Sequence, residues 1–218
     1  MVCFRPRLYL ALLALSIGLS LPLPSRAEEP GAGLATLSEP QLRDLLPSLR
    51  KGGYILYFRH AMTRQDQEDQ QPVRLEDCGS QRNLSDEGRA QARRIGTAFH
   101  ALGLPVGTVL SSPFCRTLET ARLAFGQATP SDDLYFAIGL ARPEREAKGA
   151  VLRRLLATPP PARTNTVLVA HTVNLQEAIG YWPKPEGAAF LIQPEGAGQF
   201  RVIGRVAPET WALTAASR

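Results

Sequence analysis

The residues of this chain best suited to nucleophilic and proton-transfer chemistry are its three histidines, His60, His100 and His171. His60 comes after the apolar run YILYF and is preceded by Arg59, and His171 directly follows the apolar run TVLVA. His100 lies inside a helical pattern, AFHALG, where we expect a side chain on the helix surface. The two histidines that end apolar runs are therefore the candidate chemical pair.

A metal-free phosphoryl-transfer site requires a nucleophile, fixed positive charge and a proton donor. Neutral imidazole can attack phosphorus and form a phosphohistidine, and the planar guanidinium group of arginine matches the geometry of phosphate oxygens. His60 and His171, with Arg59 and with Arg116 in the turn SSPFCR, supply the first two requirements. A set of unrelated polar residues is the alternative that these residue types alone leave open.

The apolar runs around these residues alternate between strand-like and helix-like patterns. Strands are expected at 54–58, 108–110 and 166–170, with a closing pair at 190–193 and 200–206. Helices are expected from Ser38, from Ser85, after the SSPF turn, at 142–157 and at 172–180. Such alternation predicts an α/β fold with a mostly parallel sheet. In such sheets ligands bind beyond the carboxyl ends of the strands, which is where His60, His171 and Arg116 would meet.

The first 27 residues have the pattern of a secretory signal peptide. A short basic segment precedes an apolar stretch from Leu8 to Leu21, and PLPSRA then offers small residues for cleavage after Ala27. An uncleaved membrane anchor is the alternative, but fourteen apolar residues fall short of the roughly 20 that span a bilayer. We therefore expect a periplasmic or secreted protein with no stable membrane span.

The rest of the chain has the size of one domain. We expect a flexible lead-in at 28–37, a single domain at 38–210 and a C-terminal tail at 211–218. The net charge of the whole chain is +5, but residues 1–27 carry three arginines and no acid, so cleavage leaves +2. No basic block with interleaved aromatic residues is present, and a nucleic acid is not an expected partner.

Two cysteines, Cys78 and Cys115, remain after cleavage. In an oxidising compartment such a pair tends to form a disulfide. That bond would stabilise the fold by about 3–4 kcal/mol on the chain-entropy estimate, because it lowers the conformational entropy of the unfolded chain. Two buried free thiols are the alternative.

Four segments resemble the motifs of the histidine phosphatase superfamily, which includes the phosphoglycerate mutases. YFRHAMT (57–63) resembles its RHG signature, RNLSDEGRAQARRIG (82–96) its LSxxGxxQA helix, SSPFCRTLETA (111–121) its SSPxxRxxxTA segment, and VLVAHTVNL (167–175) the strand that carries its second histidine. The segments occur in the family's order. The resemblance implies a three-layer α/β/α sandwich with a mostly parallel central sheet, and a site that needs no metal and no cofactor.

The resemblance also assigns a role to each matching residue. It makes His60 the phosphorylated nucleophile, Arg59 and Arg116 the arginines that hold the phosphate, and His171 the second histidine, which hydrogen-bonds the phosphoryl group. Thr63 lies where the family often has a further phosphate-contacting side chain, and a helix cap is the alternative role.

The sequence departs from the family in two places. Ala61 replaces the glycine of the signature, so the fit of its methyl group depends on the local backbone angle. The glutamate that serves as general acid in phosphoglycerate-mutase-like members is missing from 133–137, and Thr172 stands where the other large branch has an aspartate. Glu186 is the candidate acid. The other acids considered are Asp133, Glu144 and Glu146, and Glu119 is expected to orient Arg116.

These observations predict an exported, metal-independent phosphomonoesterase whose substrate is a small-molecule or protein phosphate ester. The alternative is a catalytically weak or inactive protein of the same fold that binds phosphate or interacts with the cell envelope, since the acid is unassigned. A metal hydrolase built on His60 and His171 has no HxxxH or HxH spacing and no carboxylate cluster to support it.

Overall fold

The computed structural model describes Met1 and residues 34–217. The expected cleavage site at Ala27 and residues 28–33 of the expected lead-in lie outside the described residues. The strands are β1 (Ile55–Arg59), β2 (Val106–Ser111), β3 (Thr129–Pro130), β4 (Asn165–Ala170), β5 (Ala189–Gly196) and β6 (Gln199–Val206). The α-helices are α1 (Glu39–Lys51), α2 (Asp86–Leu102), α3 (Cys115–Phe125), α4 (Arg142–Ala157), α5 (Thr172–Ile179) and α6 (Pro208–Ala216), and short 3-10 turns occur at Cys78–Ser80 and Asp132–Leu134.

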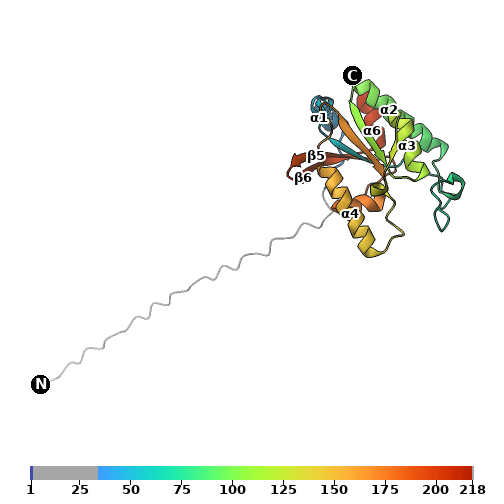
Figure 1. Ribbon diagram of the computed structural model, residues 1–218. Coiled ribbons are helices and arrows are strands. Elements are labelled where there is room, and N and C mark those ends of the chain that lie inside the picture. The colour runs from blue at the N-terminus through green and yellow to red at the C-terminus, as the bar shows by residue number, and fades with distance from the viewer. Residues whose placement is uncertain (2–33, 218) are drawn as a thin grey trace.

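The six strands form one mixed sheet in the order β3-β2-β4-β1-β5-β6 (Figure 1). Strands β1, β2, β3 and β4 pair in parallel with one another, whereas β5 pairs antiparallel with both β1 and β6. The expected α/β fold with a mostly parallel sheet is therefore confirmed, with an antiparallel edge formed by the β5–β6 hairpin.

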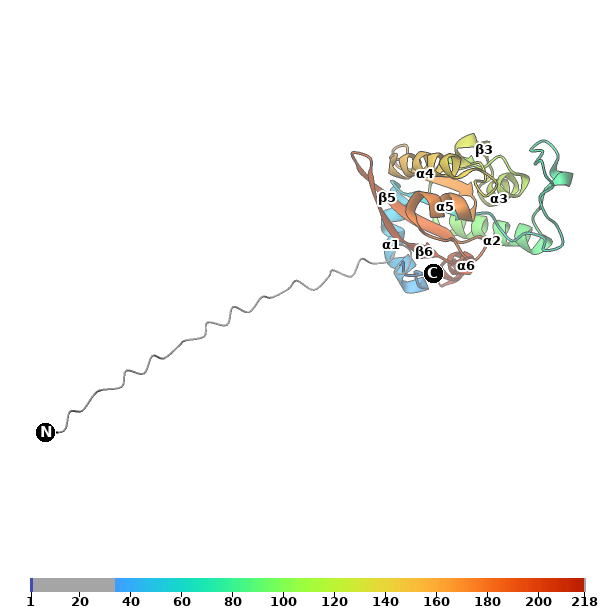
Figure 2. The same ribbon diagram turned by 90° about the horizontal axis from the view of Figure 1, so that it is seen from below.

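Helices cover both faces of this sheet, which gives the three expected layers (Figure 2). Alternate side chains of β1 divide between the two faces: Leu56 and Phe58 pack with α1, α2, α3 and α6, while Ile55 and Tyr57 pack with α4 and α5. This alternation follows from the two-residue period of a strand. A strand that is apolar on both faces must be covered on both, which explains the unbroken run YILYF.

The C-terminal boundary expected at residue 210 is wrong. Residues 208–216 form helix α6, and Trp211 is fully buried among Phe58, Phe99 and other residues of the larger core. Pro208 in the first turn of α6 is a favourable helix start, because proline lacks only an N–H that would be unpaired there. Burial of a tryptophan makes this segment part of the domain and not a tail.

The end of the expected flexible lead-in is also ordered against the sheet. The backbone N–H of Leu37 donates to the carbonyl of Arg205 in β6, and the N–H of Arg205 donates to the carbonyl of Ala35. Leu37 is buried. Residues 35–37 therefore pair with β6 before α1 begins.

Candidate functional site

Strand register brings the two histidines together at the carboxyl end of the sheet. In the parallel pairs Arg59 lies opposite Ala170, and Ser111 lies opposite Val169, so β1, β4 and β2 end side by side. The residues after these ends continue the pairing, because His60 N–H donates to the Ala170 carbonyl and Ser112 N–H donates to the Val169 carbonyl. The His60 and His171 ring centres are consequently 5.5 Å apart.

His60 is held with one ring nitrogen committed to the backbone. Its Nδ1 lies 2.8 Å from the carbonyl oxygen of Ala61, and since a carbonyl can only accept, Nδ1 carries the proton. Nε2 then keeps its lone pair. Burial and the positive charge of Arg116 hold the pKa of His60 well below its usual value, so the imidazole is neutral at neutral pH. A neutral, oriented imidazole is the form that can act as a nucleophile.

Ala61 fits in place of the signature glycine because its backbone does not adopt a positive φ. Its methyl group packs with Leu84 and Ala92, and its N–H donates to Thr120 Oγ1. The next segment approaches α2 very closely: a Cβ on Gly88 would lie 1.8 Å from the Met62 carbonyl oxygen. The glycine of the LSxxGxxQA-like segment is therefore needed for helix α2 to pack against the chain that follows His60.

His171 is oriented by a serine and two aromatic rings. Its Nε2 lies 2.9 Å from Ser112 Oγ, and its ring contacts those of Phe136 and Phe114 at centroid distances of 4.3 and 5.1 Å. Burial lowers the pKa of His171 well below its usual value. Sequence reasoning missed Ser112 as a partner of His171, although it belongs to the matched SSPxxR-like segment.

Arg59 and Thr63 share the carboxylate of Glu186. Arg59 Nη2 donates to Glu186 Oε1 at 3.0 Å, Thr63 Oγ1 donates to the same oxygen at 2.9 Å, and the Thr63 N–H donates to Oε2 at 3.1 Å. Glu186 Oε1 also lies 3.9 Å from Nδ1 of His60. Both carboxylate oxygens of Glu186 thus accept hydrogen bonds. The carboxylate lies on the Nδ1 side of the His60 ring, whereas a leaving group would be close to Nε2. Glu186 is therefore placed to position Arg59 and Thr63, and its expected role as general acid stays a prediction.

Arg116 is completely buried in the first turn of α3. Its Nη1 donates to Asp69 Oδ1 at 2.9 Å and to the Arg82 carbonyl at 3.3 Å, and its guanidinium group lies 4.7 Å from the Phe114 ring centre and 5.3 Å from that of Phe136. Its Nε and Nη2 have no hydrogen-bond partner among residues 34–217. Two buried donors of one guanidinium group are therefore free to receive oxygen atoms.

Arg82 is a second residue that sequence reasoning missed. Its positive charge contributes to lowering the pKa of His60, His171, Arg59 and Arg116, so it lies close enough to act on all four. Among the described residues its side chain forms no ion pair. Its place at the start of the RNLS segment was the only available signal, since an arginine in a polar loop is ordinarily a surface charge.

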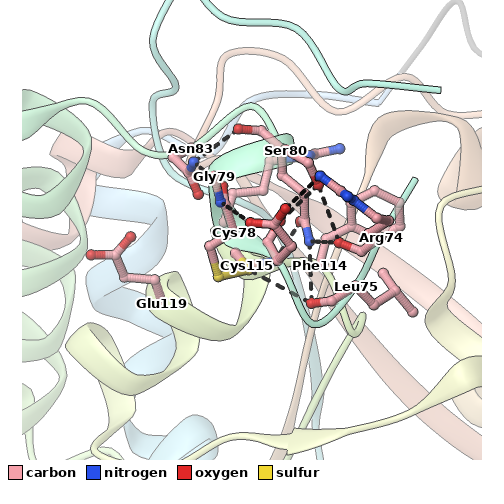
Figure 3. Close-up of a disulfide and its surroundings, with 12 residues drawn as sticks. Arg74, Leu75, Cys78, Gly79, Ser80, Asn83, Phe114, Cys115 and Glu119 are labelled. Carbon is pink, nitrogen blue, oxygen red and sulfur yellow. Dashed lines mark hydrogen bonds and ion pairs between the residues drawn. A yellow bond between two sulfur atoms is a disulfide. The ribbon is translucent and has the colours of Figure 1, made fainter. Parts of the chain in front are cut away.

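The expected disulfide between Cys78 and Cys115 is confirmed, with the two Cα atoms 5.7 Å apart (Figure 3). It joins the 3-10 turn of the polar loop to the first turn of α3, one residue before Arg116. The Cys115 N–H also donates to Gln81 Oε1 at 2.9 Å. The loop is thereby fastened beside the arginine by both a covalent and a hydrogen bond.

The remaining acidic candidates lie elsewhere. Asp133, Glu144 and Glu146 are exposed. The role expected for Glu119 is wrong: its carboxylate pairs with Arg89 of α2 at 2.7 Å and not with Arg116. Glu119 lies three residues after Arg116 on helix α3, but its side chain meets the neighbouring helix because α2 and α3 pack together.

No cluster of three or more histidine, cysteine or carboxylate side chains that could hold a metal ion occurs within residues 34–217. None of the helices in that range is long and apolar enough to cross a membrane.

A surface groove of about 790 Å³ lies between the end of α4 and the β5–β6 turn. This groove lies at the end of the sheet away from His60, because the start of β5 at Ala189 pairs with the end of β1 and the groove is lined by Gly196 at the other end of β5. No histidine or carboxylate side chain lines the groove. The candidate site is therefore the buried cluster around His60.

The fold and the site together define a class of protein. It is an α/β protein with two histidines and arginine side chains at the carboxyl ends of its parallel strands. Residues 55–133 match the family model described as the histidine phosphatase superfamily, branch 1. No curated protein matches the chain in sequence. The matched range contains Arg59, His60 and Arg116 and ends before His171.

Solved structures share the fold at low sequence identity. A structure of the protein histidine phosphatase SixA complexed with tungstate is 15% identical, with a TM-score of 0.51 over 71% of this chain and 97% of that chain. A phosphoserine phosphatase from Entamoeba histolytica in complex with 3-phosphoglyceric acid is 13% identical, with a TM-score of 0.51 over 72% of this chain and 98% of that chain. The resemblance to the histidine phosphatase superfamily drawn from the four motifs is confirmed, and this chain has the fold of that superfamily.

Proposed function

We propose that this protein is a phosphomonoester hydrolase that acts through a phosphohistidine intermediate on His60 and requires no metal ion. The observation that carries the proposal is a set of buried side-chain nitrogen atoms of the candidate site that find no hydrogen-bond partner in the described part of the chain: Arg59 Nε, Arg116 Nε and Nη2, and His171 Nδ1. Buried donors are costly when unpaired. The oxygens of a phosphoryl group would satisfy them with charge-assisted hydrogen bonds.

In the first half of the reaction, Nε2 of the neutral His60 attacks the phosphorus atom. The N–P bond forms as the ester P–O bond breaks, and the electron pair leaves with the ester oxygen. Arg59 and Arg116 stabilise the charge that builds on the phosphoryl oxygens, and the backbone carbonyl of Ala61 keeps the Nδ1 proton in place. The carbonyl also stabilises the positive charge that the ring acquires.

In the second half, water attacks the phosphorus of phosphohistidine and the N–P bond breaks. Inorganic phosphate leaves and His60 is restored. The same arginines hold the phosphoryl group in both halves, so their positions need not change. The burial of Arg116 strengthens each contact because little water competes for its donors.

We further propose that the protein works outside the cytoplasm, in the periplasm or as a secreted protein. The signal-peptide pattern of residues 1–27 and the Cys78–Cys115 disulfide both favour an oxidising compartment. The substrate would then be a small-molecule or protein phosphate ester, and neither a nucleic acid nor a membrane span is part of the proposal.

The test is hydrolysis of p-nitrophenyl phosphate by the chain from Glu28 onward, in excess EDTA. We expect turnover that EDTA does not reduce, and a loss of more than about 10³-fold in the His60→Ala variant. His100→Ala is the matched control, because His100 is an exposed residue of α2, and it should keep full activity. Quenching at alkaline pH, where the N–P bond is stable, should trap phosphohistidine in the wild type and none in His60→Ala. Activity that survives in His60→Ala would disprove the intermediate.

A phosphate-binding protein with little or no turnover is the second candidate. It is favoured by the closure of the site, where His60 is 2% exposed, His171 1% and Arg116 0%. This reading predicts that the folded protein binds phosphate or phenylphosphonate in calorimetry but does not hydrolyse aryl phosphates between pH 4 and 8. Measurable turnover would exclude it.

A further inference from the structure

Hydrolysis of a phosphate ester with a basic leaving group requires a proton donor, and Glu186 is not arranged to be one. Both of its oxygens accept hydrogen bonds from Arg59 and Thr63. The carboxylates at 132–146 are exposed. Within residues 34–217, the other carboxylate in an ion pair with an arginine of the site is Asp69, on Arg116.

Asp69 has one oxygen fixed and one free. Its Oδ1 accepts from Arg116 Nη1 at 2.9 Å and from the Arg82 backbone N–H at 2.9 Å. Its Oδ2 accepts no hydrogen bond from the described residues, and 14% of the side chain is exposed. Asp69 is thus held at the edge of the buried site through Oδ1, and its Oδ2 is the oxygen that can carry a proton.

The loop at 64–83 is built to hold Asp69 there. Its two arms are joined by Arg64 N–H to the Asn83 carbonyl, Asn83 N–H to Gln67 Oε1, and Gln70 N–H to the Ser80 carbonyl. The Cys78–Cys115 disulfide then ties the far part of the loop to the helix that carries Arg116. The position of Asp69 therefore depends on a hydrogen-bonded and covalently fastened structure.

We propose that Asp69 is the general acid of this site, an inference that rests on the proposed phosphatase function. Without substrate, Arg116 stabilises the Asp69 carboxylate. A phosphoryl group held by Nε and Nη2 of Arg116 would share that guanidinium group with Asp69, so the acid and the ester would be held by the same side chain.

The proton then follows the electron pair of the breaking bond. As His60 Nε2 forms the N–P bond, the ester P–O bond breaks and the leaving oxygen takes the proton from Asp69, which becomes a carboxylate. In the second half the carboxylate takes a proton from the water that attacks phosphohistidine. Phosphate leaves, His60 is regenerated, and Asp69 again holds the proton, so the cycle balances.

The test compares two esters that differ in their need for a proton donor. Phenyl phosphate has a basic leaving group, and 2,4-dinitrophenyl phosphate has a leaving group that departs without protonation. We expect Asp69→Asn to lower kcat about 10²-fold or more on phenyl phosphate, and less than about 10-fold on the dinitrophenyl ester. An equal loss on both esters would mean that Asp69 only positions Arg116, and no loss on either would mean that it has no role; both results overturn the proposal.

Two controls separate an acid from a structural residue. Asp66→Asn changes an exposed aspartate of the same loop that pairs with Arg64, and it should leave both rates unchanged. Glu186→Gln should lower the rates on both esters by a similar factor, since Glu186 positions Arg59. A loss in Glu186→Gln that is confined to phenyl phosphate would assign the acid to Glu186 and overturn the proposal.

A folding defect is recognised by a second variant. Asp69→Glu keeps a carboxyl group and should recover part of the phenyl phosphate activity that Asp69→Asn loses, whereas equal rates for the two variants would contradict the proposal. Wild-type protein that hydrolyses neither ester would overturn the phosphatase function itself, and the acid with it. A wild type that hydrolyses both, with an unaffected Asp69→Asn, would overturn only the acid.

Discussion

The strand ends and the 64–83 loop both reach the candidate site, but they hold their side chains by different means. His60 and His171 follow strands whose register is fixed by backbone hydrogen bonds and by a sheet buried on both faces. Asp69 and Arg82 come from a polar loop held by side-chain hydrogen bonds and one disulfide. The positions of the strand-end side chains are therefore fixed by the core of the fold. The positions of the loop side chains are fixed by local hydrogen bonds and by the disulfide that joins the loop to α3.

Arg116 is the point where the two regions meet, and its removal should have the largest effect. In Arg116→Ala the phosphoryl group loses two buried donors and Asp69 loses its cation. We expect kcat/KM to fall about 10³-fold on p-nitrophenyl phosphate, or about 4 kcal/mol. Arg122→Ala, at an exposed position of the same helix, is the matched control and should retain activity. A loss below 10-fold would show that Arg116 does not contact the reacting group.

The Cys78→Ser variant tests the loop without changing the strand ends. Loss of the disulfide should destabilise the fold by about 3–4 kcal/mol on the chain-entropy estimate, which corresponds to a melting temperature lower by roughly 10 °C. The difference from wild type should disappear when both proteins are measured in reductant. Equal melting temperatures of wild type with and without reductant would contradict the prediction.

The strand-end residues could be predicted from the sequence, and the loop residues could not. An apolar run that ends on His60 or His171 specifies both the strand and the position of the histidine at its end, and parallel pairing then brings such ends together. Asp69 and Arg82 lie in a polar segment without periodicity, where nothing local indicates which side chain turns inward. The cysteines were the one readable signal there, and they led to the correct disulfide.

The errors have equally local causes. The expected pairing of Glu119 with Arg116 relied on their separation of three residues, but helix α2 offers Arg89 as the nearer partner. The tail expected after residue 210 overlooked PETWALTAA, where a proline start and one tryptophan are sufficient for a short helix that buries a large side chain. Contacts between elements decided both cases, and a single sequence does not specify those contacts.

A smaller effect should come from pH, and it tests the burial of the strand-end histidines. Burial lowers the pKa of both His60 and His171 in the fold, whereas both take up protons near pH 6.5 once the chain unfolds. Between the lowered pKa values and 6.5 the unfolded chain binds more protons, so the free energy of unfolding falls as pH falls. The slope is about 1.4 kcal/mol per pH unit for each histidine. Thermal melts from pH 7 to pH 5 measure it.

The control for this pH effect is a variant that removes one of the two groups. His60→Asn should reduce the slope by about half between pH 6 and pH 5, because His171 alone then contributes. A melting temperature that rises as the pH falls over this range would contradict the neutral, buried state of the pair.

The smallest effect expected is at Ser112, whose hydroxyl group meets His171 at 2.9 Å. Ser112→Ala removes one hydrogen bond, worth about 1 kcal/mol, and should lower kcat/KM by roughly 5-fold. The effect stays small because the contacts of the His171 ring with Phe136 and Phe114 remain. Ser111→Ala is the control, since the Ser111 hydroxyl donates to a backbone carbonyl and does not touch the ring. A loss as large as that of Arg116→Ala would mean that Ser112 contacts the phosphoryl group itself, and that the β2 strand end contributes a ligand and not only a support.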